Sequence, residues 1–214
     1  PLNGGCFRNV EVKTRPGTVV HALYPAAVAA GNVETSQRLV DVIFGALAQA
    51  LPGRIPAASC GTMNSVALGG KNWTYYETIG GGSGAGPGYA GASAIQCHMT
   101  NTLNTPAEAI EMQYPLRVRR FEREADSAGV GTHRGGDGII RVIEVLEDCE
   151  GTILTDRRLS RPYGLAGGSP GKSGANAVTS GPQVKAVSGK ANLSLKAGET
   201  LKIVTPGGGG WGKQ

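Results

Sequence analysis

The chain has 214 residues with 35 glycines and 12 prolines, and this length is enough to bury a substantial core. The glycine and proline content stays below that of disordered low-complexity chains, and the basic residues behind the net charge of +5 form no long run with interleaved aromatics. Disorder and nucleic-acid binding are therefore disfavoured.

The four cysteines form no C-x-x-C pair, and no apolar run reaches membrane length, so we expect a cytoplasmic protein with free thiols. Because the chain begins at Pro1, we also expect a piece of a longer protein.

The first 115 residues are expected to form an α/β part. Residues 1–31 have strand propensity and are expected to be extended, with a turn at Arg15-Pro16-Gly17. A helix is predicted over residues 36–51, capped by Thr35 or Ser36 and ended by Pro52-Gly53. Its apolar residues recur at four-residue spacing and form one face: Leu39, Ile43 and Leu47.

The segment Gly80–Gly91 holds seven glycines in twelve residues, directly before a polar cluster at residues 97–104. Glycine is favoured where φ is positive or where a backbone approaches a ligand or another backbone closely. Two interpretations follow. The segment is either the wall of a site that includes His98, Asn101 and Asn104, or a glycine-rich connection packed against a sheet.

A second helix is predicted to start at Thr105, with Pro106 at its first position. Glu108 lies three residues after Thr105, which is the spacing of a capping box. Glu111 follows on much the same face, so the two carboxylates are also candidates for acid–base work or metal binding.

Residues 116–214 are expected to be β-rich, because short apolar runs alternate with glycine and proline. The predicted strands are 73–79 in the first part, and 116–119, 139–146, 153–155, 185–187 and 201–204 in the second. The sequence thus predicts an α+β fold, a glycine-rich mixed domain with a few helices, in two parts at 1–115 and 116–214. Trp211, after four consecutive glycines, indicates that the last segment docks.

Residues 166–173, AGGSPGKS, match a relaxed phosphate-loop pattern. That loop functions only between a strand and a helix, and neither flank predicts the required element. We therefore interpret it as a surface turn with an exposed Lys172.

Six motifs in order resemble the hydantoinase B family over essentially the whole chain. They are GNVETSQR, GGGSGAGPGYAG, HMTNTLNTPAEAIEMQYPL, DSAGVGTHRGGDGIIR, DRRLSRPYGLAGGSPG and TPGGGGWG. The resemblance corresponds to the C-terminal portion of a longer subunit, whose family metal ligands lie outside this sequence. His21, His98 and His133 are scattered without ligand spacing, so we assign no metal ligands here.

This resemblance implies part of an ATP-dependent cyclic amide hydrolase, which opens a lactam or hydantoin ring together with a hydantoinase A-type partner. A subunit of an acetone- or acetophenone-type carboxylase and a structural assembly domain are the alternatives. ATP and a divalent metal are implied for the full assembly, and neither is expected on this chain alone. The implied partners are the hydantoinase A-type chain or domain, the missing N-terminal hydantoinase B region and a small cyclic amide. Nucleic acid and membrane are not expected as partners.

For the chemistry, our hypothesis is that His98 carries a proton while Asn101 and Asn104 bind a carbonyl or its oxyanion. Arg134 or Arg158 would hold a carboxylate or phosphate by a two-pronged contact. We place Glu108 and Glu111 with the substrate-binding groups. The competing interpretation of His98 is a buried residue that binds loop backbone.

Overall fold

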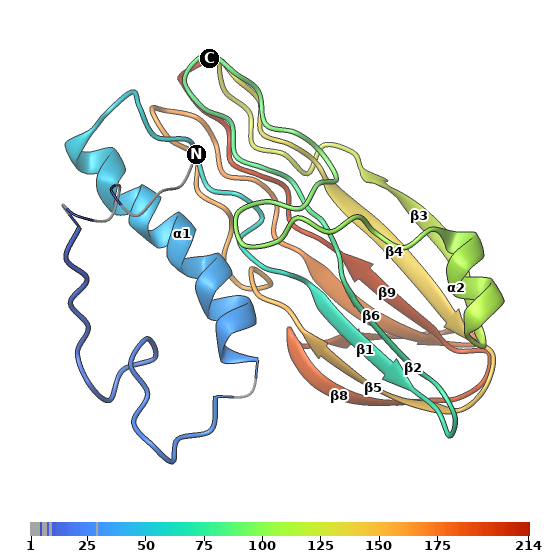
Figure 1. The fold of residues 1–214 in the computed structure, drawn as a ribbon. Helices are drawn as coiled ribbons and strands as arrows, with labels where there is room; N and C mark the ends of the chain where they lie inside the picture. The colour runs from blue at the N-terminus through green and yellow to red at the C-terminus, as the bar shows by residue number, and fades with distance from the viewer. Residues whose placement is uncertain (1–4, 6–7, 9, 29) are drawn as a thin grey trace.

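A computed structural model describes residues 5, 8, 10–28 and 30–214, which form two antiparallel sheets and two helices (Figure 1). The helices are α1 (Gly31–Ala50) and α2 (Ala107–Gln113). The strands are β1 (Ser65–Gly69), β2 (Thr74–Thr78), β3 (Leu116–Glu124), β4 (Gly138–Val145), β5 (Cys149–Leu154), β6 (Ala175–Ser180), β7 (Gln183–Val187), β8 (Lys190–Leu195) and β9 (Thr200–Val204). This arrangement confirms the predicted α+β class with few helices.

The strands pair only with antiparallel neighbours, in the orders β2-β1-β5-β8 and β3-β4-β9-β6-β7. One buried apolar cluster draws on both sheets and on α2, with members such as Val66, Ile143 and Ile110. Antiparallel strands that bury one face produce this kind of layered packing. β1 and β2 share a sheet with β5 and β8, so strands from both sides of residue 115 belong to one sheet.

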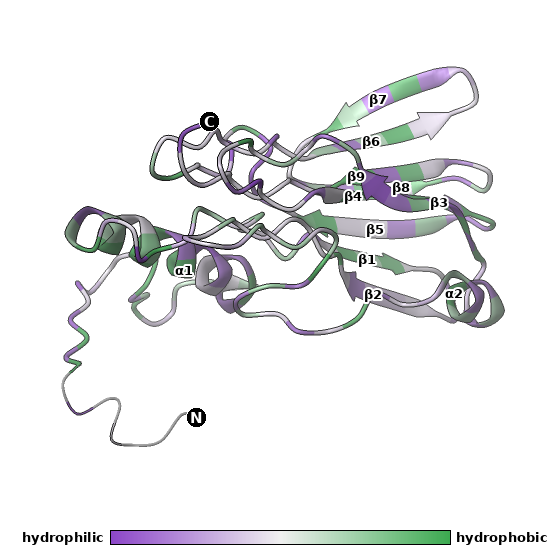
Figure 2. Cartoon of the chain, turned by 90° about the horizontal axis from the view of Figure 1, so that it is seen from above, coloured by the Kyte–Doolittle hydropathy of each residue, from purple (hydrophilic) through white to green (hydrophobic). Residues whose placement is uncertain are grey.

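Glycine-rich segments continue beyond the strands and run side by side at the end of the molecule that carries α1 (Figure 1, Figure 2). They contain no regular strand, yet their backbones are hydrogen-bonded to one another. Gly136 N–H donates to Ser83 C=O at 2.9 Å, and Gly208 N–H donates to Gly136 C=O at 2.8 Å. We call this the glycine bundle, and it consists of residues 57–61, 80–92, 129–137, 162–174 and 205–212.

The glycines of this bundle serve close packing of one backbone on another. A Cβ added at Gly84 or Gly136 would lie 1.8 Å from the carbonyl oxygen of Ala57 or Ala92, respectively. Neither glycine has a positive φ, so turn formation does not explain them. Of the two interpretations of residues 80–91, these contacts support a packed glycine-rich connection, although it packs against other glycine segments rather than against a sheet.

The start of α1 differs from the prediction. The helix begins at Gly31, five residues before the predicted residue 36, and Ala30 at its N-cap has a left-handed φ of 53° with no side-chain cap. Ser36 lies inside the helix, where its hydroxyl donates to Asn32 C=O. Capping by Thr35 or Ser36 is therefore wrong, because the preceding GNVE segment already has helical backbone.

The capping box of the second helix is also absent. Pro106 is the N-cap of α2 and makes no side-chain cap bond. The Thr105 N–H instead donates to the carboxylate of Glu77 on β2 at 2.5 Å, so the tertiary contact has replaced the local one. The exposed Glu108 is left on the surface of α2.

The remaining elements follow the sequence more closely. Strands lie at all six predicted positions, while β1, β6 and β8 lacked a prediction of their own. Trp211 docks as expected, with its indole N–H donating to Ile55 C=O at 3.1 Å. The phosphate-loop pattern leads into strand β6 rather than a helix, and Lys172 is exposed, as predicted. Residues 10–28 form a turn at 16–17 but no strand, and the rest of the predicted N-terminal extended segment lies partly outside the described residues.

Candidate active site beneath helix α1

Helix α1 turns its polar side toward the body of the molecule. Glu34, Gln37 and Asp41 are buried, and their spacing of three and four residues places them on one face. Ile43, on the predicted apolar face, is 53% exposed instead, and Leu47 is also exposed. A helix that buries carboxylates and an amide while exposing aliphatic side chains uses its inner face for polar contacts.

Asp41 is the centre of these contacts. Its Oδ1 accepts from Ser59 N–H at 3.1 Å and lies 3.1 Å from Nε2 of His98, while its Oδ2 accepts from Arg157 at 3.3 Å. The side chain is almost fully buried, so these donors replace the water that an ionised carboxylate requires. Gly61 makes room for the group, because a Cβ there would lie 2.6 Å from Oδ2.

His98 is held from two sides in a left-handed backbone conformation, with φ 62°. The Gln37 amide donates to Cys97 C=O at 2.8 Å and accepts from Met99 N–H at 3.0 Å, so it clamps the residues on both sides of the histidine. The ring edge also packs on Phe44, with ring centroids 5.8 Å apart. A positive φ is uncommon for a residue other than glycine, and here the Gln37 contacts hold it in place.

The environment of His98 favours its protonated form. Burial alone lowers the pKa, but the hydrogen bond to Asp41 and the negative charges of Cys97 and Asp41 outweigh it, so the pKa lies above its ordinary value. Within the described residues, Nδ1 of the ring has no hydrogen-bond partner. When Nε2–H donates to Asp41, Nδ1 is the nitrogen that can take up a proton.

Two cysteines lie against this histidine. The sulfurs of Cys60 and Cys97 are 3.9 Å apart. The hydrogen bond from Cys60 lowers the pKa of Cys97 to about 7, although burial opposes the change, and the charge of His98 lowers it further. The pKa of Cys60 is raised in turn, first by its bond to Cys97 and then by burial. Cys97 therefore has the thiolate character of the pair.

Within the described residues, none of the other predicted site residues forms a hydrogen bond with His98 or Asp41. Asn104 uses its amide to bind backbone, donating to Thr78 C=O at 3.0 Å and accepting from Gly80 N–H at 3.4 Å. Asn101 is exposed and has no side-chain hydrogen bond within the part of the chain that the structure describes. Glu108 and Glu111 lie on α2, at the opposite end of the molecule from α1 (Figure 1).

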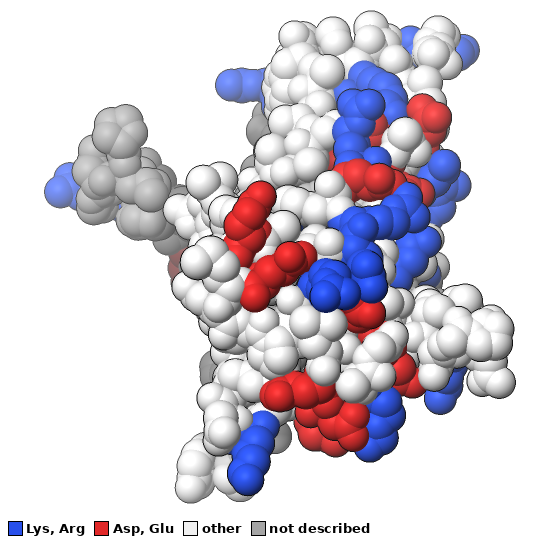
Figure 3. All heavy atoms as spheres, turned by 90° about the vertical axis from the view of Figure 1, so that its right-hand side faces the viewer, with Lys and Arg blue, Asp and Glu red and all other residues white. Residues whose placement is uncertain are grey.

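The two predicted arginines are engaged within the protein. Arg134 makes its two-pronged contact with Asp137, at 2.7 and 3.1 Å. Arg158 binds the side-chain oxygens of Asn64 and Asn176 at 2.7 and 2.8 Å. On the side that carries β3, Figure 3 shows basic groups interleaved with acidic ones, and Arg119 there pairs with Glu144 at 2.8 Å.

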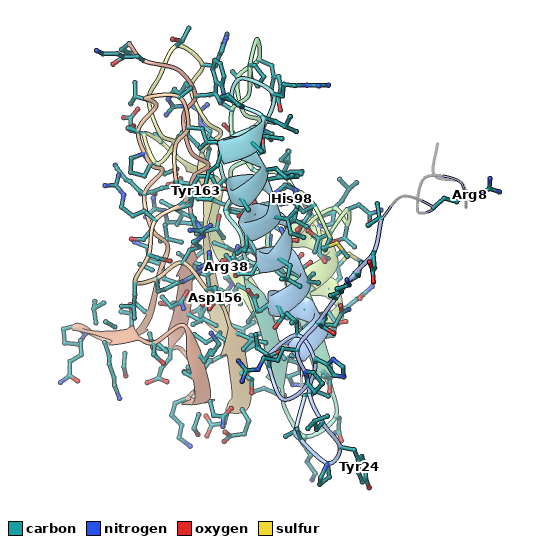
Figure 4. All side chains as sticks on the ribbon, turned by 90° about the vertical axis from the view of Figure 1, so that its left-hand side faces the viewer. Arg8, Tyr24, Arg38, His98, Asp156 and Tyr163 are labelled. Atoms are coloured by element: carbon teal, nitrogen blue, oxygen red, sulfur yellow. The ribbon has the colours of Figure 1, made fainter. Side chains whose placement is uncertain are left out.

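The sequence indicated His98 as a candidate but not Asp41, Gln37 or Arg157, which contact His98, the residues beside it or Asp41 in the structure. The missed signal is in the helix itself, where polar residues recur at positions 34, 37, 38 and 41, with the same spacing as an apolar stripe. Figure 4 shows the result, with α1 lying across the site, His98 on one side of the helix and Tyr163 and Arg38 on the other.

Neither a metal cluster nor a membrane span is found in the described ranges. Among these residues, no three His, Cys, Asp or Glu side chains are arranged to hold a metal ion. None of the helices there combines the length and the apolar character that crossing a membrane requires.

A family model described as hydantoinase B/oxoprolinase matches residues 1–214. The chain belongs to this family. Among hydantoinase B/oxoprolinase relatives, the uncharacterized protein MJ0963 of Methanocaldococcus jannaschii is 46% identical over 99% of the chain, and 5-oxoprolinase 1 of Arabidopsis thaliana is 44% identical over 99%. The chain spans only 38% and 16% of their respective lengths.

Two solved structures share the fold. The ATP-dependent caprolactamase from Pseudomonas jessenii aligns with a TM-score of 0.86 at 26% identity, over 100% of this hydantoinase B/oxoprolinase chain and 40% of the other. An acetone carboxylase in its nucleotide-free form aligns with a TM-score of 0.61 at 19% identity, over 82% of this chain and 29% of the other. The second likeness concerns the fold alone.

Proposed function

We propose that this chain is part of an ATP-dependent cyclic amide hydrolase in which His98 transfers protons during ring opening. The observation that supports this most directly is the His98–Asp41 contact, in which a buried carboxylate holds one ring nitrogen and leaves the other open. The 5-oxoprolinase and the ATP-dependent caprolactamase among the related proteins are consistent with this chemistry. ATP use is proposed for the full assembly, with the nucleotide on a hydantoinase A-type partner.

In this proposal, His98 accepts a proton from the attacking water through Nδ1 and returns it to the ring nitrogen that leaves. Asp41 fixes the orientation of the ring and stabilises its charged form, as the carboxylate of a catalytic triad does. Asn101, three residues after His98, is the candidate donor to the amide carbonyl. Asn104 would support it by holding the loop to β2, in agreement with its bonds to Thr78 and Gly80.

The remainder of the subunit is the nearest proposed partner. Helix α1 exposes Val42 (60%), Ile43 (53%) and Leu47, and the valines of residues 10–28 are exposed as well. A large exposed apolar surface can mark an interaction site in soluble proteins. Because the chain spans only 38–40% of MJ0963 and the caprolactamase chain, we infer that the rest of a hydantoinase B-type subunit covers this surface.

The test is turnover of the assembled enzyme, measured as ADP release and ring opening with 5-oxoproline and hydantoin. We expect His98→Asn to lower turnover by about 10²–10⁴-fold, the usual effect of removing a general acid–base group. His133→Asn makes the same change at a different described histidine and is expected to leave turnover near that of the wild type. Unchanged turnover in a folded His98→Asn enzyme would contradict the proposal.

Two further arms separate the alternatives. A loss confined to Glu108→Gln would move the chemistry to α2, at the other end of the molecule. Release of ADP that depends on added carbonate and a ketone would identify the carboxylase alternative, which the shared fold of acetone carboxylase motivates. An assembly that keeps full turnover in both variants would favour the structural assembly domain.

A further inference from the structure

A pocket lies on the side of α1 away from His98. It has a volume of about 290 Å³ and opens between α1, the loop after β5 and the turn between β7 and β8. Arg38 comes from α1, Arg157 and Arg158 come from the loop, and Lys190 begins β8. Figure 4 shows Arg38 and Asp156 together on this side of the helix, with His98 on the other.

The charges around this pocket are not balanced. Its lining includes four cationic side chains and one carboxylate, that of Asp156, which pairs with Lys190 at 2.6 Å. Arg157 is paired with Asp41, whereas Arg158 binds only neutral oxygens, including those of Asn64 and Asn176. Arg38 pairs with no carboxylate in residues 10–28 or 30–214. Neither Arg38 nor Arg158 thus forms an ion pair with a carboxylate in the described residues, although Glu34 and Asp156 lie near enough to act on the charge of Arg158.

Arg38 is also short of hydrogen-bond partners. One terminal nitrogen, NH1, is buried without a partner within the described residues, and the other reaches Ser160 Oγ only at 3.4 Å. The charge of Arg38 acts on Arg157, whose pKa is lowered by burial and then by this neighbouring cation. A buried donor without an acceptor beside a like charge is unfavourable unless an anion or ordered water binds there.

We propose that this pocket binds an oxyanion, a carboxylate or phosphate group of a small molecule, with Arg38 as its main contact. A planar guanidinium offers paired donors that match both groups, and the positive charge of Arg157 and Arg158 adds long-range attraction. Ser160 supplies a hydroxyl at the rim. This binding site is separate from the proton transfer proposed for His98, and it does not depend on the ring-opening activity.

The test is a titration of the full chain with three probes at an ionic strength held constant with sodium chloride. The probes are inorganic phosphate, 5-oxoproline and 2-pyrrolidinone, which has the same ring without the carboxylate. Binding is followed by calorimetry and by the side-chain Nε–H signals of the ¹⁵N-labelled arginines. We expect saturable binding of phosphate, of 5-oxoproline or of both, and none of 2-pyrrolidinone.

Variants assign the binding to the pocket. Arg38→Gln is expected to weaken it by about tenfold or more, because a charge-assisted hydrogen bond is lost. Arg54→Gln removes the same charge from an exposed position outside the pocket and should change the affinity for the oxyanion less than twofold. Ser160→Asp, at an exposed position, places a carboxylate beside Arg38 and should compete with the ligand, which keeps the test valid if Arg38→Gln fails to fold.

The probes also separate the sources of the oxyanion. Saturation by phosphate alone identifies a phosphate site, and saturation by 5-oxoproline identifies a carboxylate site. The proposal is overturned if neither anion saturates beyond the effect of sodium chloride, if 5-oxoproline saturates and 2-pyrrolidinone binds equally well, or if the folded pocket variants bind like the wild type. Turnover plays no part in this readout, so failure of the proposed hydrolase activity would be seen separately.

Discussion

At the scale of single residues, Asp41 connects the two sites described above. One of its oxygens lies beside His98, and the other accepts from Arg157, which lines the oxyanion pocket. Removing a carboxylate with this many donors leaves buried groups unpaired, and such changes are strongly destabilising. For this reason His98→Asn is a cleaner test of catalysis than any change at Asp41.

Glu34 is expected to make stability depend on pH. Burial raises its pKa to about 7, because one carboxylate oxygen is buried without a partner within the described residues. The unfolded chain gives up this proton near pH 4.5, so the stabilising contribution is complete below that pH and is lost as the pH rises through 7. Wild type and Glu34→Gln should be similar at pH 4, below the pKa of the unfolded chain, and the wild type should be less stable by about 3 kcal/mol at pH 8.

Urea denaturation of both proteins at the two pH values measures this difference. The amide introduced by Glu34→Gln keeps an oxygen for the N–H of Met63, which Glu34 binds at 3.1 Å, so the substitution changes the charge and little else. Parallel stability profiles for the two proteins would show that Glu34 ionises normally in the folded chain.

Among the cysteines that the structure describes, Cys97 is expected to have the most reactive thiol. Its pKa is lowered to about 7, whereas the pKa of the buried Cys60 is raised and burial raises that of Cys149 to about 11. Among the three described cysteines, iodoacetamide at pH 7 should therefore label Cys97 first, with a rate that rises through pH 7. Peptide mass spectrometry locates the label, and Cys97→Ser should remove the fast phase. Faster labelling of Cys60 would contradict the assignment.

At the scale of elements, the glycine bundle carries loops that shape the candidate active site. It contributes Ser59 and Cys60 from one segment and Tyr163 from another, and the Tyr163 hydroxyl donates to the Asp41 carbonyl of α1. Its backbones meet at distances that leave no room for side chains, so the positions of these groups depend on glycines that do not touch the site.

Gly208→Ala tests this dependence. A Cβ at that position would lie 1.9 Å from the carbonyl oxygen of Ser83, a backbone atom that cannot turn aside. We expect a loss of about 3 kcal/mol or more, at the upper end of overpacking effects. Gly31→Ala is the matched control, because its Cβ would meet only Val28 at an ordinary 3.6 Å. Chemical denaturation of both variants measures the difference in their free energy of unfolding. Equal stabilities would contradict close packing in the bundle.

Sequence patterns predicted the strands better than they predicted the glycine bundle. β2, β4 and β9 combine apolar character with strand propensity, and both signals are local. The bundle depends on which glycine segment lies beside which, and glycine has no hydropathy period that encodes a neighbour. The inward polar face of α1 was hidden for a related reason, since Leu39, Ile43 and Leu47 are spaced like a buried stripe although Ile43 and Leu47 are exposed. His98 could be named as a candidate because its polar neighbours lie beside it in the sequence, and its role stays a prediction.

At the scale of the whole molecule, the outward apolar face of α1 should matter only in the assembly. Ile43→Glu is expected to change the stability of the isolated chain by about 0.5 kcal/mol or less, because the side chain is mostly exposed. It should weaken association with the rest of a hydantoinase B-type subunit, measured by co-purification. Asn72→Glu adds the same charge at the exposed turn between β1 and β2, away from α1 (Figure 1), and should associate normally. Full association of Ile43→Glu would place the interface on another surface.

The glycine bundle has a further consequence for how the molecule responds to temperature. Unfolding it exposes peptide groups and very little hydrocarbon, and hydration of polar groups lowers the heat capacity whereas hydration of apolar groups raises it. The heat-capacity increment of unfolding should therefore fall below the usual value of about 12–15 cal/mol/K per residue. A smaller increment flattens the curve of stability against temperature. The folded chain would therefore lose less stability on cooling than a protein of equal length whose packing is mainly between apolar side chains.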